Sequence, residues 1–149
     1  MIIIKIIIDS DASPVKDIVI DEAGKRDLSV VLVASYAHFS TKIHPAHVET
    51  IYVDSAKEAA DYRIMQLLQN DDILITQDYG LASLALGKKA KVLHHKGFEY
   101  NQDNIANLLE SRYISAQIRK SGKRTKGPKP FTKEDADTFR RLLNHTLSE

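Results

Sequence analysis

Four aspartates are the side chains best suited to metal chemistry in this sequence, namely Asp9, Asp11, Asp61 and Asp78. Asp9 and Asp11 follow an apolar run over residues 1–8, and Asp78 follows a second such run at residues 72–77. Because parallel strands end at one sheet edge, these carboxylates are expected to meet where α/β proteins bind ligands. Clustered carboxylates repel one another unless a cation neutralises them, and oxygen ligands favour Mg²⁺ or Mn²⁺. The pattern therefore predicts a metal site that hydrolyses phosphodiester bonds.

Each of these acids also has a simpler interpretation. Asp78 could cap the helix that follows it, and Asp9 and Asp11 could belong to a turn after the first strand. Asp54, at the end of another strand, is interpreted as a helix-start residue. Asp61 is the most diagnostic of the acids because we expect it in the middle of a helix, where no capping role explains it and burial without a partner is costly.

A basic stretch lies between residues 112 and 129, where seven of eighteen residues are Lys or Arg. Gly122, Gly127 and Pro128 interrupt any helix there, so we expect a basic loop at about 119–130. Such a loop suits the phosphate backbone of a nucleic acid, although a basic surface loop can also serve solubility alone. The candidate phosphate-binding residues are Arg119, Lys120, Lys123, Arg124, Lys126 and Lys129, with Thr76 or Gln77 orienting a phosphate or a water.

The net charge of +1 hides an uneven distribution. Residues 1–75 hold 7 Lys/Arg against 12 Asp/Glu, and residues 76–149 hold 14 against 8. An acidic half and a basic half suit a polyanionic ligand, but charge also varies along any soluble chain. The six histidines show no metal-ligand spacing and are interpreted as structural or surface residues.

The chain contains no cysteine, which excludes disulfides, thiolate zinc sites and cysteine nucleophiles. Its apolar start is about eight residues long, well below the roughly 20 needed to span a membrane, and aspartates follow it directly. We therefore interpret this start as a core strand and expect a cytoplasmic protein that does not associate with membranes.

Strand patterns alternate with helical patterns along the chain, which predicts one domain over residues 1–149 with a three-layer α/β/α fold and a mostly parallel sheet. Ser13 is expected to cap the first helix with Pro14 at its first position, and Ser55 with Glu58 to form a capping box. Asp103 and Thr132 are the expected caps of the last two helices. Strands are expected at 1–8, 29–34, 50–53, 72–77 and 91–95, and the later helices at 81–87, 103–118 and 132–147.

Four motifs resemble the YaiI/YqxD family of small bacterial proteins, and their order and spacing match along nearly the whole chain. They are Asp9-x-Asp11-Ala-x-Pro14-Val, Ala60-Asp61-x-x-Ile64, Asp72-x-Leu-Ile-Thr76-Gln77-Asp78-Tyr79-x-Leu81-Ala82 and Gly127-Pro128-Lys129-Pro-Phe131-Thr132. The family is generally placed among PIN-like domains, so the resemblance implies a PIN-like fold with an acidic cluster like that of metal-dependent ribonucleases. Asp9, Asp11, Asp61 and Asp78 match the acids of these motifs. Ser13 stands where the family usually has Cys, and this departure argues against thiol chemistry. Gly80 stands where Pro is frequent in the family.

The leading hypothesis is a Mg²⁺- or Mn²⁺-dependent nuclease that acts on RNA, with the four aspartates as ligands or water activators. A second hypothesis is a nucleic-acid-binding protein that keeps the fold and the basic loop but does not catalyse. A third is phosphotransfer of the haloacid-dehalogenase type, with Asp9 as the nucleophile. The sequence leaves open the choice between RNA and DNA, and whether two copies form a homodimer.

Overall fold

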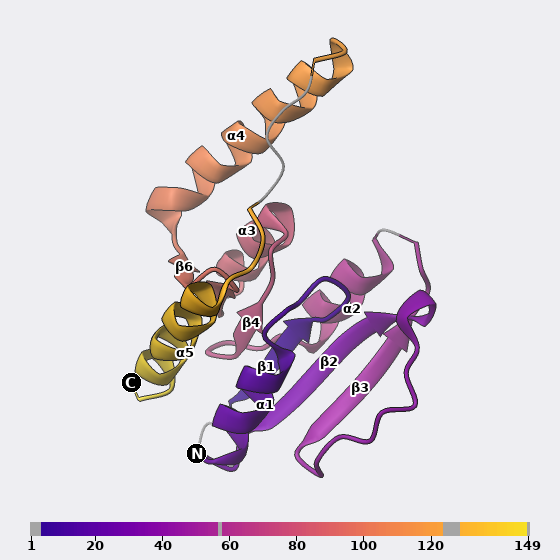
Figure 1. The fold of residues 1–149 in the computed structure, drawn as a ribbon, viewed down its shortest axis with the longest axis vertical. Coiled ribbons are helices and arrows are strands. Elements are labelled where there is room, and N and C mark those ends of the chain that lie inside the picture. The colour runs from indigo at the N-terminus through magenta and orange to yellow at the C-terminus, as the bar shows by residue number, and fades with distance from the viewer. Residues whose placement is uncertain (1–3, 57, 124–128, 149) are drawn as a thin grey trace.

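A six-stranded sheet lies between two layers of helices in the computed structural model, which describes residues 4–56, 58–123 and 129–148 (Figure 1). The strand order is β3-β2-β1-β4-β5-β6, with every pair parallel except β5 and β6. The strands are β1 (Lys5–Asp9), β2 (Ser29–Ser35), β3 (Val48–Val53), β4 (Ile73–Ile75), β5 (Lys91–His94) and β6 (Phe98–Tyr100). The helices are α1 (Lys16–Gly24), the 3₁₀ helix η1 (Tyr36–His38), α2 (Ala59–Leu67), α3 (Tyr79–Gly87), α4 (Gln102–Lys120) and α5 (Lys133–Leu147).

The two hydrophobic cores lie on opposite faces of the sheet. Ile7 of β1 packs in the core beneath α2, α3 and α4, whereas Ile6 and Ile8 pack in the core beneath α1 and α5. Successive side chains of a strand point to opposite faces, so one run of isoleucines serves both cores. The predicted three-layer α/β/α fold with a mostly parallel sheet is confirmed.

The central strand β1 pairs with β2 on one side and β4 on the other, in a register that matches Asp9 with Val33 and Ile8 with Ile75. The chain proceeds from β1 outward to β2 and β3, then returns to the other side of β1 as β4. This reversal creates a switch point, where the carboxyl ends of neighbouring parallel strands leave a crevice. Asp9 and the residues that follow Ile75 therefore lie at the expected position of a ligand site.

The opposite end of the β1–β4 pair is fixed by a buried carboxylate. Asp72 accepts from the Lys5 ammonium at 2.5 Å, from the Lys5 backbone N–H at 3.1 Å and from the Gln69 N–H at 2.8 Å. Its side chain is buried, so losing these donors would leave a desolvated charge. The contact holds the two strands that carry Asp9 and Thr76 in register.

The first helix begins later than predicted, and Ser13 is not its N-cap. α1 starts at Lys16 after Val15, and no side chain caps it. The Ser13 hydroxyl instead accepts from the Val15 N–H at 3.5 Å within the connecting turn. The prediction was wrong because a Ser-Pro pair suits a turn as well as a helix start.

The predicted capping box at Ser55 and Glu58 is also wrong. α2 begins at Ala59, and Glu58 precedes it without a side-chain cap. Asp61 therefore lies in the first turn rather than in the middle of the helix. An acid is favoured there by the helix dipole, so the position of Asp61 no longer argues for a metal ligand.

The helix that follows β6 is longer than predicted. Asn101, not Asp103, caps α4 through a reciprocal pair of bonds with Asn104. Arg119 and Lys120 belong to the last turn of this helix rather than to a loop. The predicted Thr132 cap of α5 is confirmed by its bond from the Asp135 N–H at 3.1 Å. No helix in the described part of the chain is long and apolar enough to cross a membrane.

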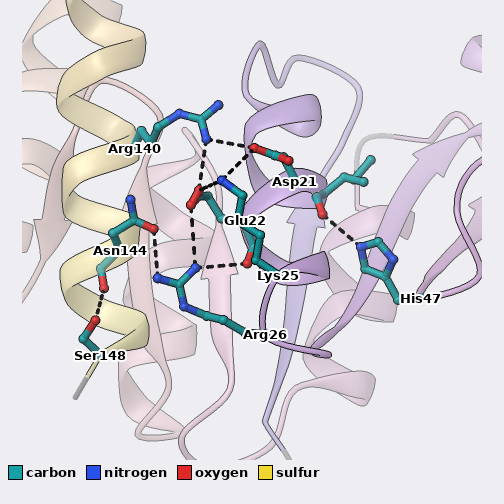
Figure 2. A network of polar contacts seen from close by, with 9 residues as sticks. Asp21, Glu22, Lys25, Arg26, His47, Arg140, Asn144 and Ser148 are labelled. Carbon is teal, nitrogen blue, oxygen red and sulfur yellow. Dashed lines mark hydrogen bonds and ion pairs between the residues drawn. The ribbon is translucent and has the colours of Figure 1, made fainter.

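An ion-pair network joins α1 to α5, two helices of the same layer (Figure 2). The Glu22 carboxylate, whose side chain is only 5% exposed, lies 3.0 Å from Arg140 Nη1, 3.4 Å from Lys25 Nζ and 3.6 Å from Arg26 Nη1. Arg140 also donates to Asp21 at 3.1 Å. A buried carboxylate needs such cations, so this network fixes the position of α5 relative to α1.

Arg140→Ala is expected to lower the free energy of unfolding, because Glu22 stays buried and loses its shortest charged partner. A loss of about 1–2 kcal/mol is expected for a charge-assisted bond when other cations remain. Urea denaturation would measure it. Arg141→Ala, which removes an exposed arginine of the same helix, should change stability by less than about 0.5 kcal/mol. Equal effects of the two substitutions would contradict the role given to Glu22.

Candidate acidic site and cationic cleft

The Thr76 hydroxyl connects two of the predicted acids at the switch point. It donates to Asp9 Oδ2 at 2.9 Å and accepts from the Asp78 backbone N–H at 3.0 Å. Thr76 is itself held by the Leu93 carbonyl, to which its N–H donates, and by the Tyr100 hydroxyl, which donates to its carbonyl at 3.2 Å. Because Thr76 is buried, its side chain serves to position Asp9 and the start of α3.

Asp11 reaches from the turn after β1 to the end of β2. Its Oδ1 accepts from the Ser35 N–H at 2.9 Å, and its Oδ2 lies 3.4 Å from His38 Nδ1. The hydroxyl of Ser35 is within 3.1 Å of the same His38 nitrogen. The turn interpretation of Asp11 therefore holds locally, and the carboxylate still faces the carboxyl edge of the sheet.

Asp78 is the N-cap of α3, as the simpler interpretation predicted. Its Oδ1 accepts from the Leu81 N–H at 3.2 Å. The same oxygen lies 3.5 Å from Nη1 of Arg112, which comes from α4. Capping does not exclude a second role, since Asp78 lies close enough for its negative charge to raise the pKa of Asp9.

Burial is the main cause that raises the pKa of Asp9, and the negative charges of Asp78 and Asp11 raise it further. The hydrogen bond from Thr76 opposes this rise in pKa. Three of the predicted acids are thus electrostatically coupled. A small pocket of about 80 Å³ collects Asp9, Asp11, Thr76 and His95 among its lining residues.

Within the described ranges no three His, Asp or Glu side chains are grouped closely enough to enclose a metal ion. Asp61 is not among the described residues that line the acidic pocket. The donors that are present still fit a hard cation, because Mg²⁺ is commonly held by one or two carboxylates together with water and substrate phosphate. Asp9 and Asp11 are the residues that would hold it.

A larger cleft of about 640 Å³ opens beside the acidic pocket, and Gln77 and His95 line both. Its cationic lining comes from Lys96, Arg112 and Arg119 together with Lys129 before α5. We call this the cationic cleft. Cations that precede residue 124 in the chain and Lys129, which follows residue 128, thus face one cavity next to the acids.

The predicted basic residues divide between this cleft and the surface. Arg119 and Lys129 line the cleft, whereas Lys120 and Lys123 are exposed and are not among its described lining residues. Arg124 and Lys126 lie outside the described residues. Lys96, which the sequence analysis did not select, donates to the Lys129 and Pro130 carbonyls and to Asp135, each at 3.0 Å, and so anchors the segment that leads into α5.

His94 and His95 also belong to the site, although the spacing of the histidines in the sequence did not indicate it. Both are buried at the carboxyl end of β5 and line the cationic cleft. His94 stacks on Phe98 with ring centroids 4.6 Å apart, and its Nδ1 accepts from the Lys96 N–H at 2.9 Å. The position after an apolar strand, the same signal that selected Asp9 and Asp78, could have identified this pair.

Comparison with known proteins identifies the family. A family model described as "Uncharacterized BCR, YaiI/YqxD family" matches residues 7–149. The chain belongs to the YaiI/YqxD family. A UPF0178 protein of Bacillus cereus strain AH187 is 63% identical over 144 residues, covering 97% of this chain and 99% of the relative. A UPF0178 protein of Bacillus anthracis strain CDC 684 is 59% identical with the same coverage.

The predicted membership of the YaiI/YqxD family is therefore confirmed over nearly the whole chain. No solved structure shows a significant match to it. The motifs on which the resemblance was based contain Asp9, Asp11 and Asp78, and these are the acids that the fold brings to one sheet edge. The candidate site of this YaiI/YqxD protein therefore lies at that edge of the sheet.

His94 is expected to make stability depend on pH. Burial, followed by the charges of His95 and Lys96, lowers the pKa of His94 from 6.5 to about 4. Between these values the unfolded chain binds a proton that the folded chain does not, so stability falls as the pH drops from 6.5 toward 4. His94→Gln, which keeps an acceptor for Lys96, should reduce this fall by about 2 kcal/mol, allowing for screening at the cleft.

Denaturation curves between pH 7 and pH 4.5 would measure the effect. His44→Gln, a substitution in the loop before β3, serves as the control and is expected to keep the parent's pH dependence. A His94→Gln curve that runs parallel to that of the parent would show that His94 does not cause the loss.

Asp9→Asn is expected to stabilise the metal-free protein at pH 7. Burial raises the pKa of folded Asp9 above its ordinary value of 3.8, so ionisation of Asp9 costs stability as the pH rises through this range. The amide removes that cost and still accepts from Thr76. Thermal melting in EDTA should show a higher Tm than in the parent, with the difference shrinking as the pH approaches 3.8.

Asp54→Asn, in an exposed acid directly after β3, is the matched control and should leave the Tm nearly unchanged. A lower Tm for Asp9→Asn would mean that the charged bond from Thr76 outweighs burial and repulsion.

Proposed function

We propose that this YaiI/YqxD protein is a metal-dependent nuclease that hydrolyses phosphodiester bonds of RNA. The observation that supports it most is the adjacency of opposite charges: the pocket with Asp9 and Asp11 shares Gln77 and His95 with the cationic cleft. A nucleic acid strand presents phosphates at regular intervals, so cations can hold flanking phosphates while one phosphate faces the acids. An uncharged ligand would need neither feature.

The side chains of the chain have distinct parts in this proposal. Arg119 and Lys129 of the cleft neutralise flanking phosphates. Gln77 is exposed where the two cavities meet and can donate its amide to a phosphate oxygen. Asp9 is oriented by its bond from Thr76 and lines the same pocket as Asp11, so the two carboxylates can act on one cation.

A bound Mg²⁺ or Mn²⁺ would supply charge stabilisation at the phosphate and lower the pKa of water. Asp9 and Asp11 are the residues proposed to hold it, and the negative charge of Asp78 at the start of α3 acts on Asp9. In the overall reaction the oxygen of water attacks phosphorus, the P–O ester bond breaks, and the departing oxygen takes a proton. Asp61 is not required by this arrangement.

A second candidate function is nucleic-acid binding without catalysis. It is favoured by the protein contacts that two of the acids already have: Asp11 with Ser35 and His38, and Asp78 with Leu81 and Arg112. A metal would have to compete with these donors. The cationic cleft by itself is sufficient for binding.

The Asp9→Asn/Asp78→Asn double variant tests catalysis. Loss of a partner outside the ligand shell typically costs about 10–100-fold, so loss of Asp9 as a ligand is expected to reduce Mn²⁺-dependent cleavage at least about 100-fold. Cleavage of a labelled RNA would be followed on denaturing gels, with folding checked by circular dichroism. Asp54→Asn should retain activity. Binding without cleavage by the parent, in either Mg²⁺ or Mn²⁺, would instead support the binding protein.

Arg119→Gln tests the cationic cleft separately. Affinity for RNA is expected to fall to a similar extent for different sequences, and the slope of log K against log salt should decrease by about 1. Fluorescence anisotropy in EDTA measures both quantities without cleavage. Arg63→Gln on α2 is the charge-matched control. Equal effects of the two substitutions would contradict a specific role for the cleft.

A further inference from the structure

An exposed aromatic cluster lies at the carboxyl ends of β2 and β3, on the side of the acidic pocket away from the cationic cleft. The rings of Tyr36 and Tyr52 stack with centroids 5.9 Å apart and an interplanar angle of 21°, and Phe39 packs on Tyr52 at 5.1 Å. Tyr36 is 59% exposed and Phe39 is 63% exposed. We call these three residues the aromatic platform.

Hydrogen bonds to the backbone hold the platform in place. The Tyr52 hydroxyl accepts from the Ser40 N–H and donates to the Ser40 carbonyl, each at 3.3 Å. The Phe39 N–H donates to the Tyr36 carbonyl at 3.1 Å, which closes η1. The backbone is therefore held by these bonds while two ring surfaces remain in solvent, so a ligand that covers the rings would gain the free energy of apolar burial.

The platform is directly connected to the acidic pocket. Ser35, the last residue of β2, donates its N–H to Asp11, and His38 of η1 lies 3.4 Å from the same carboxylate. Tyr36 follows Ser35 in the chain. A ligand that reaches Asp11 along this edge would meet the rings next.

The loop that carries Tyr36 and Phe39 adds no negative charge of its own, and its Lys42 lies 3.5 Å from Asp17. Residues 36–48 contain one lysine and three histidines but no acidic residue. The rings adjoin the acidic pocket, which shares Gln77 and His95 with the cationic cleft, and a nucleic acid strand combines aromatic faces with a negative backbone that suits this succession. Bases that are not paired stack on exposed aromatic side chains in this way.

We propose that Tyr36, Phe39 and Tyr52 bind an unpaired nucleobase of the strand whose phosphates occupy the cationic cleft. This inference rests on the proposed function, because it assumes that the strand crosses the acidic pocket. The platform then fixes the position of the strand on one side of Asp9 and the cleft fixes it on the other. It is a binding site separate from the acids.

Phe39→Leu and Phe39→Trp test the stacking. Binding of a labelled single-stranded 12-mer RNA to the full chain would be measured in EDTA by anisotropy. Phe39→Leu keeps the apolar bulk but removes the ring, and is expected to weaken binding about 5- to 100-fold, as loss of one base–aromatic stack does. Phe39→Trp should bind at least as tightly as the parent. Tyr62→Leu, in a tyrosine of α2 that is 69% exposed, is the control and should bind normally.

Two further readouts distinguish stacking from a general loss of structure. The chain has no tryptophan, so the indole in Phe39→Trp is the sole such reporter, and its emission should be quenched on binding RNA. A 12-mer with abasic positions should bind the parent less tightly than the normal 12-mer does. The loss of affinity caused by the abasic positions should be smaller in Phe39→Leu, because the ring and the base contribute through the same contact and their removals are not additive.

The outcomes separate this inference from the proposed function. If Arg119→Gln weakens binding while Phe39→Leu does not, the platform is not a base site, and a protein partner becomes its expected occupant. If neither the parent nor any variant binds RNA, in EDTA or with Mg²⁺, both the proposed function and this inference fail. Weaker binding by Phe39→Leu together with normal binding by Tyr62→Leu supports the platform even if the parent never cleaves RNA.

Discussion

The parallel pairing of β1 with β4 is the constraint on which the candidate site depends. Its register puts Ile8 opposite Ile75, so that Asp9 and Thr76 follow side by side. A shift of one residue would turn the Asp9 side chain to the other face of the sheet and break its bond from the Thr76 hydroxyl. At the opposite end of the pair, buried Asp72 holds Lys5 and opposes such a shift. The same few contacts thus stabilise the centre of the sheet and position the acids.

The site combines groups that are unfavourable by themselves. Asp9 is partly desolvated and lies near two other carboxylates, which raises its pKa. The cations of the neighbouring cleft come from α4, from the turn after β5 and from the segment before α5. In the part of the chain that the structure describes, Arg112 lies 3.5 Å from Asp78, and Lys96 pairs with Asp135 rather than with an acid of the pocket. An anionic ligand accompanied by a divalent cation would neutralise both the acids of the pocket and the cations of the cleft.

The carboxyl edge of the sheet therefore presents three kinds of surface in succession. The cationic cleft lies beside β5, the acids lie at the ends of β1 and β4, and the aromatic rings lie beyond β2 and β3. Because strand order sets this succession, residues distant in the sequence become neighbours: Asp11 contacts Ser35, and Asp78 contacts Arg112. The α1–α5 network fixes α5 against α1, while Lys96 holds the segment that carries Lys129.

The sequence alone determined the features that depend on local spacing. Isoleucine and valine runs predicted the strands, Asp78 and Thr132 were recognisable as caps, and the acids at strand ends indicated the edge that would matter. The tertiary structure decided which groups converge. It placed Asp61 in the first turn of α2, excluded Ser13 and Ser55 as caps, and brought His94, His95 and Arg112 to the site. Periodicity and capping act over a few residues, whereas convergence depends on strand order and on how whole helices pack, which no local pattern records.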